Sequence, residues 1–180
     1  MEKVEPEIGD IIFVVRGDHK LSWLQKIITK VTKGPAFHVS MYAGNGQVFE
    51  TDGAYGKASY FPLTKYADDA IDVYRLALIT QEDKDRIQDI CKLLKGTPYS
   101  YWDIAVKFVT SPLVNNKIRF GRWLQEALGT KQFKICNELV MYILYEATLY
   151  KPFQHSEEWT PASFRELCRQ LFPEVFNIVY

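Results

Sequence analysis

Two short segments joined by a turn signal constrain the fold of this chain more than any other feature. Residues 37–42 and 47–51 have the length and the β-branched and aromatic content that are typical of strands. Ala43-Gly44-Asn45-Gly46 lies between them, and an Asn-Gly pair between apolar segments is a strong signal for a tight hairpin. The sequence therefore predicts a β-hairpin early in the chain.

Further strands and helices are expected on both sides of this hairpin. Short apolar runs predict strands over residues 8–15 and 71–78. Capping signals predict three helices: from the Ser22 cap to residue 32, from the Thr80 cap to Gly96, and after Thr160-Pro161. Helical spacing predicts further helices over residues 102–109, 122–128 and 136–147. Hairpin-linked strands mixed with helices indicate the α+β class. The length of 180 residues fits a single domain spanning residues 1–180.

Composition and charge exclude several classes of partner. Basic and acidic residues balance to a formal net charge of zero, so the sequence shows no electrostatic footprint for nucleic acid. The N-terminus is acidic before a short apolar run, which fits neither a signal peptide nor a membrane helix of about 20 apolar residues. We therefore expect a cytoplasmic protein by default, without an integral membrane segment. Three scattered cysteines with no clustered Cys/His spacing predict neither a disulfide framework nor a metal site, and no cofactor is expected.

The three cysteines occupy different positions on the expected helices. Cys91 and Cys168 lie on apolar helical faces, where a free cysteine serves as a small hydrophobic side chain. Cys136 stands at the start of a helix, where unpaired backbone N–H groups lower the pKa of a thiol and can hold an oxyanion. Because Cys136 also falls on the apolar side of its helix, a core role remains open for it on these grounds alone.

A cysteine nucleophile needs a base, and the three histidines differ in context. His19 and His155 lie in polar runs that indicate solvated loops. His38 lies inside the first strand of the hairpin, where a histidine is either a satisfied half-buried residue or a positioned base.

Glu50 is the candidate that would orient this base. A three-residue loop would place the side chains of His38 and Glu50 on one face of the hairpin, whereas a two-residue Asn45-Gly46 turn would place them on opposite faces. On one face, Glu50 can accept a hydrogen bond from one imidazole nitrogen and leave the other nitrogen for Cys136. Otherwise Glu50 is a solvated carboxylate on an edge strand.

Several segments resemble the NlpC-type papain-like peptidases. The run from His38 to Glu50 is similar to the histidine hairpin of that family. Ile135-Cys136-Asn137-Glu138-Leu139-Val140 resembles its nucleophile motif, and Gly9-Asp10-Ile11-Ile12-Phe13 resembles its Gly-Asp strand. Histidine precedes cysteine in this chain, and that order resembles the circularly permuted branch, which includes the YiiX-like proteins and the lecithin:retinol acyltransferase-like enzymes.

Two further segments and two departures complete the resemblance. Residues 96–103, which include Tyr99, are similar to the tyrosine-bearing segment before the nucleophile in YiiX-like proteins, and Thr160-Pro161 is similar to the start of the final helix. Asn137 stands where many members have serine, and Glu50 stands where many unpermuted relatives have histidine or another polar residue.

The resemblance implies a circularly permuted papain-like fold, in which an antiparallel sheet or partial barrel packs against helices. It implies a cysteine hydrolase with Cys136, His38 and Glu50 as catalytic residues and Tyr99 as an oxyanion or substrate-binding residue. NlpC-type relatives cleave peptide bonds in cell-wall stem peptides, so the expected substrate is a peptide or an amino-acid amide. The alternatives are a lipid acyltransferase or thioesterase of the lecithin:retinol acyltransferase-like type with an acyl substrate, and a non-catalytic binding module on the same fold.

Overall fold

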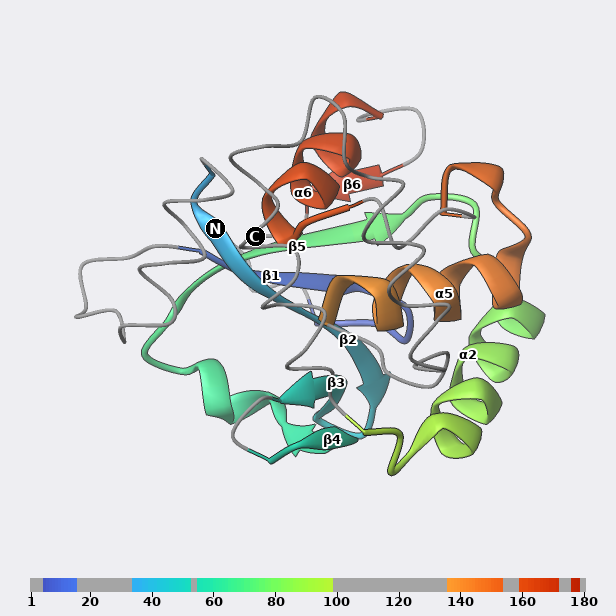
Figure 1. The fold of residues 1–180 in the computed structure, drawn as a ribbon. Helices are drawn as coiled ribbons and strands as arrows, with labels where there is room; N and C mark the ends of the chain where they lie inside the picture. The colour runs from blue at the N-terminus through green and yellow to red at the C-terminus, as the bar shows by residue number, and fades with distance from the viewer. Residues whose placement is uncertain are drawn as a thin grey trace, which may run out of the picture.

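The computed structural model describes residues 5–15, 34–52, 55–98, 136–153, 159–171 and 176–178, and these form an α+β fold (Figure 1). The strands are β1 (Ile11–Val15), β2 (Ala36–Gly44), β3 (Gln47–Asp52), β4 (Lys57–Pro62), β5 (Ala70–Leu76) and β6 (Phe176–Ile178). The helices are α2 (Gln81–Leu94), α5 (Cys136–Thr148) and α6 (Pro161–Gln170), with short 3-10 helices η1 (Leu63–Tyr66) and η3 (Lys151–Phe153). The strands form one antiparallel sheet in the order β4-β3-β2-β1-β5-β6.

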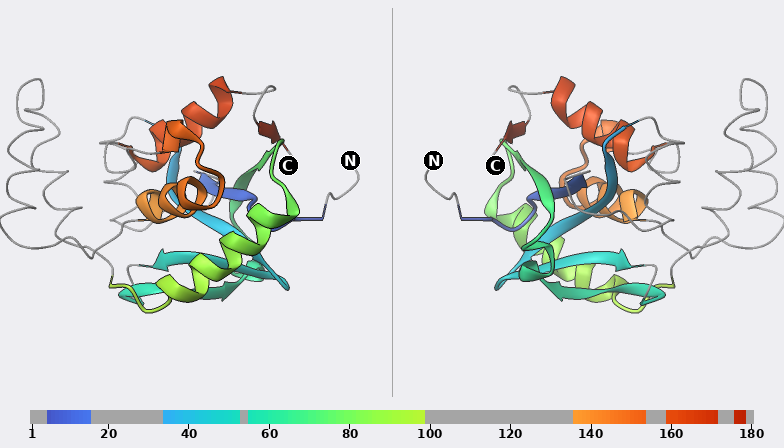
Figure 2. Two further views of the ribbon diagram at one scale, coloured as in Figure 1. Left: turned by 90° about the vertical axis from the view of Figure 1, so that its right-hand side faces the viewer. Right: turned by 90° about the vertical axis from the view of Figure 1, so that its left-hand side faces the viewer.

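The sheet has a buried cluster of apolar side chains on each face. On one face, α2, α5 and α6 pack against strand residues such as Phe13 and Met41, and α5 lies between the other two helices (Figures 1 and 2). On the other face, Val14, Val48 and Tyr66 belong to a second cluster. Because both faces are covered, β1 at the centre of the sheet is almost entirely buried, as its uninterrupted apolar sequence predicts.

Most of the expected elements are present, with shifted ends. The hairpin strands, the capped helix after Thr80 and the helix that begins at Cys136 all form. Thr80 and Thr160 each make a capping box with the residue three positions later, which explains where α2 and α6 begin. The sequence analysis did not predict β4 or η1. The helices expected at 22–32, 102–109 and 122–128 lie outside the described residues.

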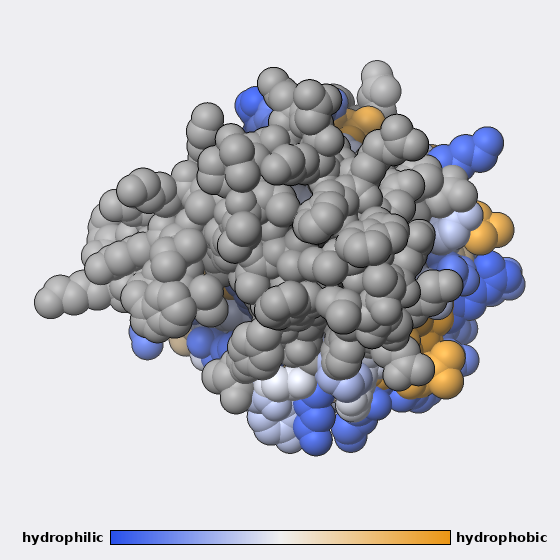
Figure 3. Space-filling model, viewed as in Figure 1, coloured by the Kyte–Doolittle hydropathy of each residue, from blue (hydrophilic) through white to orange (hydrophobic). Residues whose placement is uncertain are grey.

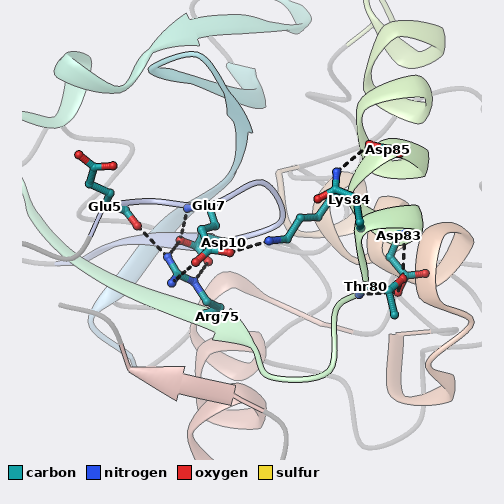
Figure 4. Close-up of polar contacts among 9 residues, drawn as sticks. Glu5, Glu7, Asp10, Arg75, Thr80, Asp83, Lys84 and Asp85 are labelled. Carbon is teal, nitrogen blue, oxygen red and sulfur yellow. Dashed lines mark hydrogen bonds and ion pairs between the residues drawn. The ribbon is translucent and has the colours of Figure 1, made fainter.

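The strand expected over residues 8–15 begins only at Ile11, because residues 8 and 9 form a turn. Gly9 has a φ of +94°, which a residue with a side chain rarely adopts, and a Cβ atom there would lie 2.6 Å from Ile79 Cδ1. The buried Asp10 side chain accepts two hydrogen bonds from the guanidinium of Arg75, at 2.9 and 2.8 Å (Figure 4). The Gly-Asp motif therefore has a structural role, since it starts β1 and ties it to β5.

Glu7 extends this anchor to α2. It accepts hydrogen bonds from Arg75 at 2.7 Å and from Lys84 at 2.5 Å (Figure 4). Both donors help to lower the pKa of Glu7, first through the hydrogen bond from Lys84, which outweighs the effect of its slight burial. The ion pairs thus join the turn before β1 to the sheet and to α2.

A few large hydrophobic side chains of the described residues are exposed. Among the coloured residues at the margins of Figure 3, hydrophilic positions are the more common, and hydrophobic positions lie beside them. The large hydrophobic residues that are exposed come from separate turns and helix ends: Tyr55, Leu78, Leu93 and Leu149. Among the helices that the structure describes, none has the length and hydropathy needed to cross a membrane.

Candidate active site

Cys136 lies at the first position of α5 and is 6% exposed. Every residue of α5 from Cys136 to Met141 is buried, so the start of this helix is enclosed on all sides. The first N–H groups of a helix have no partners within the helix, and the positive end of the helix dipole lies among them. This position provides N–H donors for a developing negative charge.

Asn137, which stands where many members of the resembled family have serine, makes a buried hydrogen bond beside Cys136. Its Nδ2 group donates a hydrogen bond of 2.6 Å to the backbone carbonyl of Trp159, and its side chain is fully buried. Trp159 directly precedes Thr160, the capping residue of α6. The asparagine therefore connects the first turn of α5 to the start of α6, next to the cysteine.

The hairpin places His38 and Glu50 on one face by a route that the sequence analysis did not consider. The turn is the two-residue Asn45-Gly46 turn, with φ values of +53° and +69°, and by itself it would separate the two side chains. Gly44 pairs with Gln47, but Tyr42 pairs with Val48, so one extra residue, at position 43, forms a β-bulge in β2. The bulge shifts the register by one residue and restores the shared face.

A second bulge lies just before His38. Val14 pairs with His38 and Val15 pairs with Ala36, so Phe37 is the extra residue. A bulge bends a strand and turns its side chains, and bulges are frequent beside functional sites. Irregular pairing on both sides of His38 thus sets the direction in which its imidazole points.

The structure brings His38, Glu50 and Cys136 together. His38 Nε2 lies 2.8 Å from Glu50 Oε2, and the side chain of Glu50 is fully buried. Cys136 lies close enough to His38 to help raise the pKa of its imidazole. Since Glu50 occupies Nε2, the other imidazole nitrogen, Nδ1, is left for Cys136.

Electrostatics within this group favour a charged imidazole. Burial by itself lowers the pKa of His38, but the charge of Glu50, the contacts with Cys136 and the hydrogen bond to Glu50 outweigh burial and raise the pKa to about 10. Burial likewise raises the pKa of Glu50, but His38 and then Lys65 outweigh it and lower the pKa to about 2. Near neutral pH, Glu50 is therefore a carboxylate and His38 an imidazolium.

Two further residues contact Glu50 and were missed by the sequence analysis. Lys65 Nζ donates to Glu50 Oε1, and the Tyr66 hydroxyl donates to Glu50 Oε2. Both residues belong to η1, which follows the unpredicted strand β4. The segment Leu63-Thr64-Lys65-Tyr66 contains no motif that would indicate a site in the sequence.

The other chemically active residues do not contribute described contacts to this site. Cys91 and Cys168 are fully buried in the core, as the sequence predicts. Burial raises the pKa of the Cys91 thiol to about 12 and raises that of Cys168 as well, so both remain protonated. Tyr99, the expected oxyanion or substrate-binding residue, and the histidines His19 and His155 lie outside the described residues.

Comparison with known proteins finds similarity to solved structures but not to the sequences of curated proteins. No protein-family model matches the chain, and no curated protein matches its sequence. A solved structure that resembles it is the metalloprotein YiiX from Escherichia coli O157:H7, with a TM-score of 0.54 and 19% sequence identity. The match covers 79% of this chain and 67% of YiiX. At this level of identity the likeness concerns the fold alone, and the chain has a YiiX-like α+β fold, as the sequence resemblance predicts.

Proposed function

We propose that this chain is a cysteine hydrolase that cleaves an amide bond in a peptide or an amino-acid amide. Cys136 is the nucleophile, His38 is the base and Glu50 orients and charges His38. In this proposal the chain is a single circularly permuted papain-like domain of the NlpC type. The observation that carries the proposal is the contact of His38 with both Glu50 and Cys136, at the start of a helix.

The mechanism begins from the thiolate–imidazolium pair, in which Nδ1 of His38 already holds the proton of the Cys136 thiol. The thiolate sulfur attacks the carbonyl carbon of the amide, and the C=O electron pair moves to oxygen. Backbone N–H donors at the start of α5, with Tyr99 from the preceding segment, hold this oxyanion. An oxyanion donor of this kind contributes about 10²–10³-fold to a rate. The intermediate collapses, the C–N bond breaks, and His38 returns its proton to the leaving amine.

Attack of the Cys136 sulfur on the carbonyl carbon lowers the pKa of His38, which helps His38 to protonate the leaving amine. Interaction with Cys136 is one cause of the raised pKa of His38. Once the sulfur is bonded to the acyl carbon, it no longer carries charge, and that contribution is lost. His38 then becomes a stronger acid when an amine, a poor leaving group, must be protonated. Water, deprotonated by His38, finally hydrolyses the thioester and releases a carboxylic acid and the free thiol.

A metal ion does not fit this site, although YiiX is described as a metalloprotein. Within the ranges that the structure describes, no three His, Cys, Asp or Glu side chains form a group that could hold a metal. Both carboxylate oxygens of Glu50 already accept hydrogen bonds, and the ammonium group of Lys65 would repel a second cation there. The proposed mechanism therefore has no step through a metal.

The test is thiol-dependent hydrolysis of defined substrates by the wild-type protein and Cys136→Ala. Peptidoglycan stem-peptide fragments and amino-acid amides test the proposal, and short acyl esters test the acyltransferase or thioesterase alternative. We expect amide release by the wild type and none by a folded Cys136→Ala protein. Release that persists in Cys136→Ala would refute the assignment of the nucleophile. Release from esters alone would favour the lipid alternative, and absence of both activities would favour a binding module.

A further inference from the structure

We propose that Tyr66 and Lys65 are positioning residues of this site, which keep Glu50 ionised and hold its Oε2 atom against Nε2 of His38. The proposal rests on the proposed function, because it concerns how Glu50 supports the charge on His38. It gives a role to two residues from η1 that no feature of the sequence marks as functional.

The need for such residues follows from the burial of Glu50. Its side chain is fully buried, and an ionised carboxylate without solvent is costly unless donors compensate for the lost water. Without them, a buried carboxyl group takes up a proton and becomes neutral. A neutral Glu50 would no longer stabilise the imidazolium form of His38, so the thiolate of Cys136 would lose its partner charge.

Tyr66 supplies one of the compensating donors, at the Glu50 oxygen that contacts His38. Its hydroxyl donates to Glu50 Oε2, the same oxygen that faces Nε2 of His38, and the two rings lie 6.4 Å apart. Tyr66 is nearly fully buried among apolar side chains of the second cluster. Burial first, and then the charge of Glu50, raises its pKa far above neutral pH, so Tyr66 remains a donor wherever the protein is folded. Two donors on one oxygen prevent the carboxylate from rotating away from His38.

Lys65 supplies the positive charge on the other oxygen. It donates to Glu50 Oε1 and, at 2.6 Å, to Asp52 Oδ2, and its ammonium lies 4.3 Å from the centre of the Phe61 ring. Burial lowers the pKa of Lys65, but Glu50 and Asp52 outweigh burial and raise it, so the side chain stays charged. The ammonium shares the charge of Glu50 and so keeps that carboxylate a weak base that does not take the proton from His38.

Within the described part of the chain, the titratable groups that contact the Glu50 carboxylate come from two elements, β2 and η1. His38 comes from β2, Lys65 and Tyr66 come from η1, and Asp52 lies two residues beyond Glu50 on β3 and contacts it through Lys65. Cys136, at the start of α5, interacts with His38 and, more weakly, with Tyr66. Removal of Lys65 or Tyr66 therefore raises the pKa of Glu50.

The experiment measures the rate of Cys136 alkylation by iodoacetamide against pH, read by mass spectrometry on the peptide that contains Cys136. The variants are Tyr66→Phe, Lys65→Met and Lys65→Arg. The controls are Tyr60→Phe, whose ring packs against Phe49 in the cluster on the opposite face of the sheet from Tyr66, and Lys92→Met on α2. Loss of an opposite charge or a donor shifts a buried carboxyl pKa by about 1–3 units. We expect the low-pH limb of the alkylation curve to move up by about one pH unit in Tyr66→Phe and Lys65→Met. Lys65→Arg should restore the wild-type limb, and the two controls should superimpose on it.

Two outcomes separate failure of this inference from failure of the proposed function. If wild-type Cys136 reacts only as an ordinary thiol with a pKa of about 8.5, the proposed function and this inference both fail. If wild-type Cys136 reacts well below that pH, but Tyr66→Phe and Lys65→Met give the same curve, the inference alone is overturned. Lys65 is partly exposed, so the Lys65→Met and Lys65→Arg pair decides the question even if Tyr66→Phe does not fold.

Discussion

Replacement of Glu50 by glutamine keeps the shape of the side chain and removes its charge from a fully buried position. In the wild-type protein, burial lowers the pKa of His38, but Glu50 and Cys136 raise it from 6.5 to about 10. The folded protein therefore binds the His38 proton more tightly than the unfolded chain does. The pKa of Glu50 moves in the other direction, from 4.5 to about 2, because His38 and Lys65 outweigh the effect of burial.

The sign of each shift defines a pH window for stability. The contribution of His38 is fully present below pH 6.5 and is lost as the pH rises from 6.5 to about 10. The contribution of Glu50 is fully present above pH 4.5 and is lost as the pH falls from 4.5 to about 2. The His38–Glu50 pair therefore stabilises the protein most between pH 4.5 and 6.5. Glu50→Gln should remove the window of Glu50 and narrow that of His38, because Cys136 also raises the pKa of His38.

The magnitude follows from the shift on His38. One pKa unit corresponds to about 1.4 kcal/mol. Burial lowers the pKa of His38, and Glu50 is the largest of the causes that nevertheless raise it from 6.5 to about 10. If Glu50 accounts for about half of that rise, Glu50→Gln lowers the free energy of unfolding by about 2 kcal/mol at about pH 6. The difference between variant and wild type should shrink steadily as the pH rises toward 10, because His38 in the wild type loses its proton around that pH. The pKa of His38 itself should fall by about 1–3 units in the variant.

Urea unfolding at a series of pH values measures the stability difference, and NMR titration of the His38 ring, assigned with His38→Gln, measures its pKa. Glu82→Gln is the matched control, because Glu82 makes an exposed ion pair with Arg86 whose loss costs about 0–1 kcal/mol. A difference between Glu50→Gln and wild type that stays constant from pH 6.5 to 10 would refute the electrostatic argument. An unchanged His38 pKa would refute it as well.

Two predictions concern backbone positions with positive φ. Gly9→Ala should lower the free energy of unfolding by about 1–3 kcal/mol in urea titrations, since φ is +94° and the new Cβ would lie 2.6 Å from Ile79 Cδ1; stability equal to wild type would contradict the role given to the Gly-Asp turn. Leu149→Gly should raise the free energy of unfolding by about 1 kcal/mol, because Leu149 ends α5 with a φ of +55° and its side chain is exposed. A lower thermal midpoint for Leu149→Gly would show that the leucine side chain makes a contact worth more than the backbone cost.

Local sequence signals predicted the elements that carry the candidate residues. The Asn45-Gly46 pair marked the hairpin, and Thr80 and Thr160 marked helix starts, because turn geometry and capping depend on residues close together in the chain. Local signals failed where a segment is stabilised mainly by distant contacts. Strand β4 pairs along its whole length with β3, and Tyr66 is buried in a cluster built from several strands. Neither segment has a strong local pattern of its own.

The face of the hairpin on which His38 and Glu50 lie shows most clearly what the sequence could not predict. Sequence spacing left two outcomes open for His38 and Glu50, since a three-residue loop and a two-residue turn place them differently. The structure has the two-residue turn together with a bulge at position 43, so the side chains meet even though that turn alone would separate them. A bulge depends on how β2 packs between β1 and β3, and the hairpin sequence alone does not contain that information.

From the sequence alone came the chemistry available to this protein: a cysteine at the start of a helix, a histidine inside a strand and an acid on the next strand. Tertiary structure decided whether these groups meet, how deeply Glu50 is buried and which neighbours, Lys65 and Tyr66, compensate its charge. The physical reason is that helix caps and turns are stabilised by neighbours in sequence. Protonation in a buried site instead depends on the sum of charges and hydrogen bonds that the whole fold gathers around it.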